Sequence, residues 1–378
     1  ATYAEPFGLA ISADGRWLGA TAAWDHRFMR FDARTLALAG DSQLPAEPRG
    51  VIFAEGGRTA YVGHLVGGVV SAIDLASGQV TAIPVRPPRK DAEGAVVPKA
   101  IAPAKSAPVE EPNLAAGQGY GLVEVSIGKG PDGKAFPPRV LVPMASSDPM
   151  KFGAQTSFPS RYGGGGSSPA VIGAFVAVID PVAKAPLGGE VRPLFRARPE
   201  DCILPRGVAT SGSRLFVTCM GTNVVVSLDP RSVDPVTAEK ARYAVGEGPT
   251  GIAIDEVRDR ALVFSQHSLE LSVIDLASKR PDDVVRALPL ARPEVPVLDE
   301  RAALGRTLFH VTRDVRLSAD GRACASCHPD GRSDGLTWAT PDGPRQSIFL
   351  AGRVAKDPPM GWFGDHASIK QHVRFTVR

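Results

Sequence analysis

The sequence lacks a large excess of charge, a long apolar run and the composition of a helical protein. Lys+Arg exceed Asp+Glu only as 43 to 40, and this balance does not indicate a nucleic-acid partner. No stretch approaches the roughly 18 apolar residues of a membrane span. The first ten residues have no basic start and no long apolar stretch, so we expect no signal peptide there, and an exported protein would be present in mature form.

Glycine and proline are abundant, with 40 and 34 residues in a chain of 378. Both interrupt regular helix, so a mostly helical bundle is excluded and many turns between short strands are expected. Hydrophobic residues make up 43% and charged residues 22%, which suits a folded chain and argues against disorder. The length allows two or three domains.

Four segments repeat one pattern, in which a Pro-x-Gly motif precedes a strand, a polar turn, a second strand and an apolar run that ends in Asp. The motifs begin at Pro6, Pro48, Pro205 and Pro249, and the runs end at Asp32, Asp74, Asp229 and Asp275. A fifth run ends at Asp180. Repeats of about 40–50 residues built from short strands are typical of β-propeller blades. The alternative is a β-sandwich whose strands resemble one another by accident.

The repeat resembles the YVTN-type β-propeller family, because Tyr61-Val62-Gly63-His64 is a degenerate copy of that signature. The resemblance implies a mainly β fold with a ring of about seven blades, of which five are recognisable. The propeller is expected over residues 1–283, with insertions around 84–170. One blade with long insertions is expected from Gly117 to Asp180, and a further irregular blade in this region is left open. Two blades are either hidden in the insertions or absent from the N-terminal side.

The residues after the repeat carry a different pattern. A Pro-rich linker is expected over 284–296, followed by a small α-helical domain over 297–378 that opens with an amphipathic helix capped by Asp299. Within it, Cys324-Ala-Ser-Cys327-His328 is the attachment sequence for c-type haem. The two thiols bond the vinyl groups, and His328 is the proximal iron ligand.

Two other interpretations of the cysteine motif are open. Zinc would need a second ligand pair, for which the sequence offers only the distant His366 and His372. A redox dithiol usually follows a strand of a thioredoxin-like unit, which this pattern lacks. Haem attachment takes place outside the cytoplasm, so the motif predicts a periplasmic or otherwise exported bacterial protein.

The C-terminal domain resembles the bacterial di-haem cytochrome c peroxidase family, which includes the enzymes that mature methylamine dehydrogenase. The resemblance rests on the segments from Leu304 to Phe309 and from Arg316 to Gly321, on the haem motif and on Gly343-Pro344-Arg345-Gln346. The family has two haems, whereas this chain encodes one covalent haem c and no second haem. Whether the native polypeptide continues beyond Arg378 is open.

The resemblance also implies roles for residues near the haem. The distal His that the family can place before Gly-Pro-Arg is absent from Leu336 to Trp338. The sixth ligand is therefore missing or comes from downstream, with His366 as first candidate and Met360 and His372 as alternatives. A surface histidine is an equally good interpretation of His366. The remaining assignments are Arg345 as partner of a haem propionate or a solvated side chain, and Trp362 as an electron relay or a packed residue.

The other two cysteines, Cys202 and Cys219, flank the opening strand of one blade. In an oxidising compartment they form a disulfide, and buried free thiols are the alternative. His26, His64 and His267 lie near blade strands and are expected to be structural.

Three functions compete on this basis. The first is a peroxidase-like oxidoreductase of the cytochrome c peroxidase family with an open iron and peroxide as substrate. The second is an electron carrier with a redox protein partner, in which the propeller is a scaffold. The third is a non-catalytic, protein-binding propeller with an accessory cytochrome domain.

Overall fold

The computed structural model describes residues 3–85, 114–126, 128, 136–149, 172–187, 202–232, 235–278, 285–291, 296–314, 316–318, 321–340, 343–352, 358–361 and 364–376. Most of the insertions predicted around 84–170 lie outside these residues. The described part is mainly β, with five antiparallel sheets, a small hairpin and few helices. No helix in it is long and apolar enough to cross a membrane.

Four of the five sheets are four-stranded meanders in which each strand pairs with the next in sequence. The first contains β1 (Pro6–Ile11), β2 (Trp17–Ala22), β3 (Arg27–Asp32) and β4 (Leu38–Gln43), and the second contains β5 (Pro48–Ala54), β6 (Thr59–His64), β7 (Val69–Asp74) and β8 (Val80–Pro84). The fourth contains β14 (Pro205–Ser211), β15 (Arg214–Cys219), β16 (Val224–Leu228) and β17 (Glu239–Ala244), and the fifth contains β18 (Pro249–Asp255), β19 (Arg260–Ser265), β20 (Glu270–Asp275) and β21 (Val285–Pro289). Short 3-10 helices occur at η1 (Glu55–Gly57) and η3 (Pro235–Ala238).

The third sheet is the irregular unit expected to end at Asp180. It contains β9 (Ala115–Gly117), β10 (Val123–Val125), β11 (Arg139–Ser147), β12 (Ile172–Asp180) and β13 (Ala185–Pro186). Both β9 and β10 pair with β11, so two short strands take the place of one inner strand. The long strands β11 and β12 pair over eight residues and carry the sheet.

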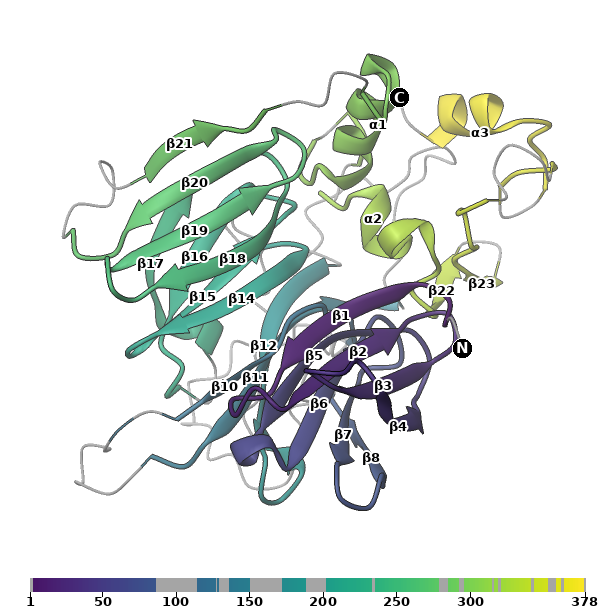
Figure 1. The fold of residues 1–378 in the computed structure, drawn as a ribbon. Helices are drawn as coiled ribbons and strands as arrows, with labels where there is room; N and C mark the ends of the chain where they lie inside the picture. Colours follow the sequence, from purple (N-terminus) through teal and green to yellow (C-terminus); the bar gives the residue numbers. More distant parts are fainter. Residues whose placement is uncertain are drawn as a thin grey trace, which may run out of the picture.

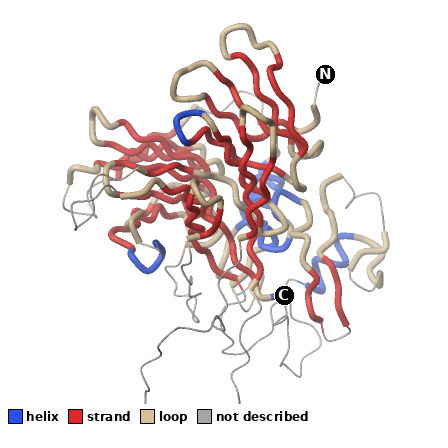
Figure 2. The backbone as a smooth tube through the Cα atoms, turned by 90° about the horizontal axis from the view of Figure 1, so that it is seen from below, coloured by secondary structure: helices blue, strands red, loops and turns tan. Residues whose placement is uncertain are grey.

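The sheets are separate and pack side by side (Figures 1 and 2), and their order follows the chain (Figure 1). Alternate residues of a middle strand face opposite neighbours, because side chains alternate along a strand. On β15, Leu215 and Val217 join the apolar cluster shared with the third sheet, whereas Phe216 joins the cluster shared with the fifth. This two-sided packing of meanders gives a β-propeller-like arrangement.

The Pro-x-Gly motifs lie at the start of the inner strands β1, β5, β14 and β18. The pairing register shifts at each of them, which marks a bulge. A Cβ atom on Gly8 would lie 2.3 Å from the carbonyl oxygen of Arg49, and one on Gly50 would lie 2.2 Å from that of Tyr120. Glycine is therefore required where each inner strand touches the next.

The same close approach of a glycine to the carbonyl oxygen of the next inner strand occurs between Gly121 and Arg206 and between Gly207 and Thr250. Beyond Thr250 the described residues show no further contact of this kind. Among the described residues, a Cβ atom on Gly251 would meet only Phe264 of its own sheet. The five sheets therefore form an arc that the described residues do not close into a ring. The expectation of seven blades remains a prediction.

The C-terminal part begins after β21. This strand pairs with β20 and belongs to the fifth sheet, although Val285–Pro289 falls in the predicted linker range 284–296. Helix α1 (Glu300–His310) begins as expected at Asp299, whose carboxylate accepts a hydrogen bond of 2.7 Å from the Ala302 N–H. No side chain of α1 is fully buried, so its amphipathic character is weaker than the sequence suggests.

The rest of the C-terminal part has little regular structure. It contains the one-turn α2 (Cys324–Cys327), the 3-10 turn η5 (Pro329–Gly331), the hairpin of β22 (Thr337–Thr340) and β23 (Gly343–Gln346), and α3 (Ile369–Thr376). These elements lie together at one end of the sheets (Figure 1).

Candidate functional site

The Cys-x-x-Cys-His segment forms a single helical turn, α2, packed against the sheets. Cys324 and Cys327 are not disulfide-bonded, and the His328 N–H donates to the Cys324 carbonyl at 2.9 Å. The Ala323 N–H donates to the Ser326 hydroxyl at 3.1 Å, which satisfies a group exposed at the start of the turn. Burial raises the pKa of the Cys324 thiol, so this sulfur is protonated at neutral pH. The arrangement places two thiols and an imidazole within five consecutive residues.

The His328 ring is oriented by a hydrogen bond. Its Nδ1 lies 2.9 Å from the carbonyl oxygen of Ile348. A carbonyl only accepts, so Nδ1 carries the proton and Nε2 of the neutral ring keeps its lone pair. Burial lowers the pKa of His328, which agrees with a neutral ring. Metal-binding histidines are commonly fixed in this way, by donating their other N–H to a backbone carbonyl.

A buried carboxylate ties this turn to the β22–β23 hairpin. The Asp334 N–H donates to the Cys327 carbonyl at 3.1 Å, and the Asp334 carboxylate accepts a bond of 3.0 Å from Trp338 Nε1. The hydroxyl of Ser347, next to Ile348, donates to the same carboxylate. Burial raises the pKa of Asp334, while its hydrogen bonds act in the opposite direction. Asp334 therefore supports both the cysteine turn and the strand end that orients His328.

Apolar packing fixes the other side of the turn. Ala323, Ala325, Cys327 and the fully buried Trp338 form one cluster with Ile172, Ile203, Leu204 and Met220 of the sheets. Cys202 and Cys219, which adjoin this cluster in sequence, form a disulfide with an S–S distance of 2.08 Å. The Gln118 amide, in the third sheet, adds a hydrogen bond of 3.1 Å to the Ser326 carbonyl. Trp338 lies in the stretch where the cytochrome c peroxidase family can place a distal histidine, and here it is a core residue.

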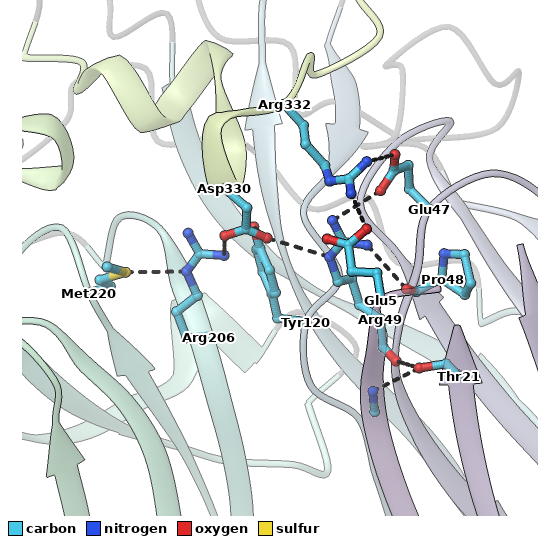
Figure 3. A network of polar contacts seen from close by, with 11 residues as sticks. Glu5, Thr21, Glu47, Pro48, Arg49, Tyr120, Arg206, Met220, Asp330 and Arg332 are labelled. Atoms are coloured by element: carbon cyan, nitrogen blue, oxygen red, sulfur yellow. Dashed lines mark hydrogen bonds and ion pairs between the residues drawn. The ribbon is translucent and has the colours of Figure 1, made fainter. Parts of the chain in front are cut away.

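Two charged residues that follow the motif anchor it to the inner strands (Figure 3). The Asp330 carboxylate lies 3.4 Å from Arg49 Nε and 3.6 Å from Arg206 Nη1, and it accepts a bond of 2.9 Å from the Tyr120 hydroxyl. The Arg332 guanidinium binds Glu47 at 2.6 Å and also Glu5. The segment that contains His328 is therefore held over the inner ends of the first four sheets.

The partners of Asp330 are the middle residues of the repeated motifs. Arg49 and Arg206 stand at the x position of Pro-x-Gly, and Tyr120 stands at the matching position of Gly119-Tyr120-Gly121 in the third sheet. Arg49 lies 4.8 Å above the Phe7 ring, and Arg206 lies 3.6 Å above the Tyr120 ring. Sequence reasoning found the Pro-x-Gly motifs and gave their middle residues no role. The sequence did offer a signal for this role, because the middle residue is an arginine in two of the four Pro-x-Gly motifs.

Phe7, Tyr120 and Arg206 border a cavity of about 510 Å³ on the inner side of the arc. Apolar side chains from the inner strands form most of its wall, including Leu9, Val51, Leu122, Val208 and Ile252. Its polar lining comes from Tyr120, Arg206, Thr250, Gln266, His310 and Asp330. We call this space the axial cavity. Asp330 both lines it and lies two residues after His328.

The three candidate sixth ligands lie together. Met360 and His366 form a backbone bridge with hydrogen bonds of 2.7 and 3.1 Å, and the His366 and His372 rings are 5.2 Å apart at their centroids. A Cβ atom on Gly361 would lie 3.1 Å from the His366 ring and 3.4 Å from the His372 ring, so a glycine lets the two rings approach the turn. Which of the three faces His328 across a haem stays a prediction.

The remaining predicted residues are less informative. Arg345 lies on β23 opposite Trp338 and donates a hydrogen bond of 2.9 Å to the Pro344 carbonyl. Trp362 lies outside the described residues. His64 is fully buried between the Ala46 carbonyl and the Ser71 hydroxyl, each 2.9 Å from a ring nitrogen. The part of the chain that the structure describes contains no cluster of three or more His, Cys, Asp or Glu side chains suited to a metal ion.

The residues present fit a covalently bound haem. The two thiols of α2 lie one turn apart and outside any disulfide, and His328 Nδ1 is bonded to the Ile348 carbonyl, which would leave Nε2 as the ligand atom. Met360, His366 and His372 are the residues that could supply a further iron ligand.

Comparisons with known proteins identify no family. No family model matches the chain, and no curated protein matches it. Among solved structures it is similar to hydrazine synthase from Kuenenia stuttgartiensis, at 15% identity and a TM-score of 0.38, over 72% of this chain and 84% of that one. It is also similar to a protein of unknown function from Desulfotomaculum acetoxidans DSM 771, at 10% identity and a TM-score of 0.44, over 78% and 74% of the two chains. At these TM-scores the likeness supports no inference about activity.

Proposed function

We propose that this chain is an exported c-type haem redox protein whose sheets are a scaffold for the haem-bearing segment. One observation carries the proposal. Two cysteines one helical turn apart, neither in a disulfide, are followed directly by a histidine whose Nδ1–H is bound by a backbone carbonyl. The resemblance of the sequence to YVTN-type propellers and to di-haem cytochrome c peroxidases supports it. The Cys202–Cys219 disulfide supports an oxidising compartment.

The residues have distinct roles in this proposal. The thiols of Cys324 and Cys327 would hold a haem by adding across its two vinyl groups, which would form one S–C bond at each and move the thiol hydrogen to the neighbouring carbon without an oxidant. His328 would offer Nε2 to the iron, and Ile348 and Asp334 hold the imidazole and the cysteine turn in place. The bound haem supplies one-electron exchange and, where a coordination position is open, reactivity towards peroxide.

Covalent attachment tests the proposal directly. Expressed with a periplasmic haem-attachment system, the chain should keep its colour after denaturation and show c-type absorption bands. Replacing Cys324 and Cys327 by Ala should abolish the colour. The matched control, Cys202→Ser with Cys219→Ser, removes the other two cysteines and should leave attachment intact. Colour that acid-acetone extracts from the unmutated protein contradicts the proposal.

The sixth iron ligand separates a carrier from a peroxidase-like enzyme. If His366 binds the iron, the ferric protein is low-spin, and His366→Ala makes it high-spin and quick to bind cyanide. A high-spin spectrum of the unmutated protein favours an open position and peroxidase-like chemistry. A low-spin spectrum unchanged by His366→Ala moves the assignment to Met360 or His372.

The alternative is a non-catalytic binding propeller with an accessory cytochrome domain. The axial cavity favours it, because a cavity of about 510 Å³ with apolar walls and a few polar groups is the size and character of a ligand site. Binding of a partner that survives the loss of both haem-attaching cysteines would support this alternative.

A further inference from the structure

The axial cavity has the lining of a site for a small organic molecule with one apolar end and one polar end. Most of its wall is apolar, and the polar groups come from Arg206, Asp330 and a few neighbours. Phe7 and Leu9, which line the cavity on β1, are 46% and 69% exposed, so the cavity is open to solvent on that side. A ligand that entered there would meet apolar side chains along the wall.

Arg206 is the cationic group of this cavity, and its donors are poorly used. Its side chain is 6% exposed, yet its hydrogen bonding within the described residues is limited to one contact of Nε with the Met220 sulfur at 3.3 Å. The Asp330 carboxylate is 3.6 Å from Nη1, which is an ion-pair distance rather than a hydrogen bond. A guanidinium has five N–H donors, and most of those of Arg206 therefore lack an oxygen acceptor among the described residues.

Tyr120 and Asp330 fix how the guanidinium is presented. The plane of Arg206 stacks 3.6 Å from the Tyr120 ring, and the Tyr120 hydroxyl donates to Asp330 at 2.9 Å. The Tyr120 ring covers one face of the guanidinium, and in Figure 3 one terminal nitrogen carries no dashed contact, beside the nitrogen that faces Asp330. Burial lowers the pKa of Arg206 to about 10, while the Asp330 charge acts in the opposite direction.

We infer that the axial cavity binds a small monocarboxylate with an apolar body, and that its carboxylate pairs with the terminal nitrogens of Arg206. A planar carboxylate matches the fork of N–H donors on a guanidinium, and the apolar body matches the wall formed by Leu9, Val51 and Ile252. Asp330 limits the affinity, because its negative charge lies on the same guanidinium. This inference does not depend on haem attachment and goes beyond the function proposed above.

Calorimetric titration of the full chain with acetate, hexanoate and benzoate tests the inference, with benzamide as the neutral match of benzoate. Benzoate and hexanoate should bind more tightly than acetate because they fill the apolar wall. Benzamide should bind at least about tenfold more weakly than benzoate, since it lacks the charge-assisted pair. Equal binding of benzoate and benzamide, or no saturation by any of the carboxylates at millimolar concentration, overturns the inference.

Two variants locate the site by acting in opposite directions. Arg206→Gln should weaken benzoate binding by at least about tenfold, and Asp330→Asn should strengthen it several-fold because a competing charge is removed. Arg231→Gln is the control, since Arg231 is a partly exposed arginine paired with Asp229 at 2.9 Å on another part of the fourth sheet. If Arg206→Gln does not fold, the gain in Asp330→Asn decides alone. Binding that neither variant changes overturns the inference, whether or not the haem proposal holds.

Discussion

Arg332 should be the main electrostatic link between the haem-binding segment and the sheets. Its side chain is 8% exposed, and its guanidinium binds Glu47, which is 15% exposed, and Glu5, which is 37% exposed. Removing one partner of a buried ion pair costs about 3–5 kcal/mol, because the other charge stays buried. Here Arg49 Nη2 still neutralises Glu47 at 3.0 Å, and the half-exposed Glu5 contributes as a surface group. We therefore expect Arg332→Met to lower the free energy of unfolding by about 2–3 kcal/mol.

Denaturant unfolding followed by circular dichroism measures this loss, and Arg316→Met is the matched control. Arg316 pairs with Asp314 in the same C-terminal part, but it is 77% exposed, so its removal should cost no more than about 0.5 kcal/mol. Arg332→Lys keeps the positive charge but lacks the planar guanidinium that binds two carboxylates. Its loss in the free energy of unfolding should therefore lie between those of Arg332→Met and Arg316→Met. Equal losses for Arg332→Met and Arg316→Met would refute the reasoning that burial makes this pair important.

Three further predictions concern the sheets and their connection to the C-terminal part. Burial lowers the pKa of His64 from 6.5 to about 4, so the native state excludes a proton that the unfolded chain takes up. This group does not affect stability above pH 6.5, and its loss of about 3 kcal/mol develops as the pH falls to about 4, so unfolding should depend less steeply on pH in His64→Gln. Reduction of Cys202–Cys219, which closes a short loop, should lower the free energy of unfolding by about 2–4 kcal/mol, and Cys202→Ser with Cys219→Ser should be insensitive to reductant. Limited proteolysis should cut between β21 and α1, where two differently built parts meet, and the fragments should stay together until denatured because apolar packing and buried ion pairs join them; a cut inside the fifth sheet would contradict this boundary.

The sequence predicted the elements that depend on local pattern. The Pro-x-Gly motifs mark four inner strands because a bulge and a close backbone contact need glycine at that point. Asp299 marks the start of α1 because a carboxylate can accept from the free N–H groups of the first turn. The inner part of the third sheet was blurred because Gly119-Tyr120-Gly121 lacks the proline of the other motifs. Strand β21 fell in the predicted linker because prolines surround it.

The candidate site was predicted only where its residues are neighbours in the chain. Cys324, Cys327 and His328 form one turn, so their spacing contains the information. The contacts that orient and anchor this turn join distant segments, as when Arg332 meets Glu5 or Gln118 meets Ser326. Such pairs depend on how the sheets pack against the C-terminal part, and no pattern in a single sequence predicts that packing.

Asp330 connects the two candidate sites of this protein. It lies two residues after His328, and its carboxylate borders the axial cavity beside Arg206. A carboxylate ligand that pairs with Arg206 would also compete with Asp330, whose other contacts are Arg49 and Tyr120. Because η5 carries Asp330 directly after His328, a shift of this carboxylate acts on the backbone that positions the imidazole. Occupancy of the cavity and the environment of a haem on His328 are therefore expected to be coupled, and the haem absorption spectrum should change when benzoate binds.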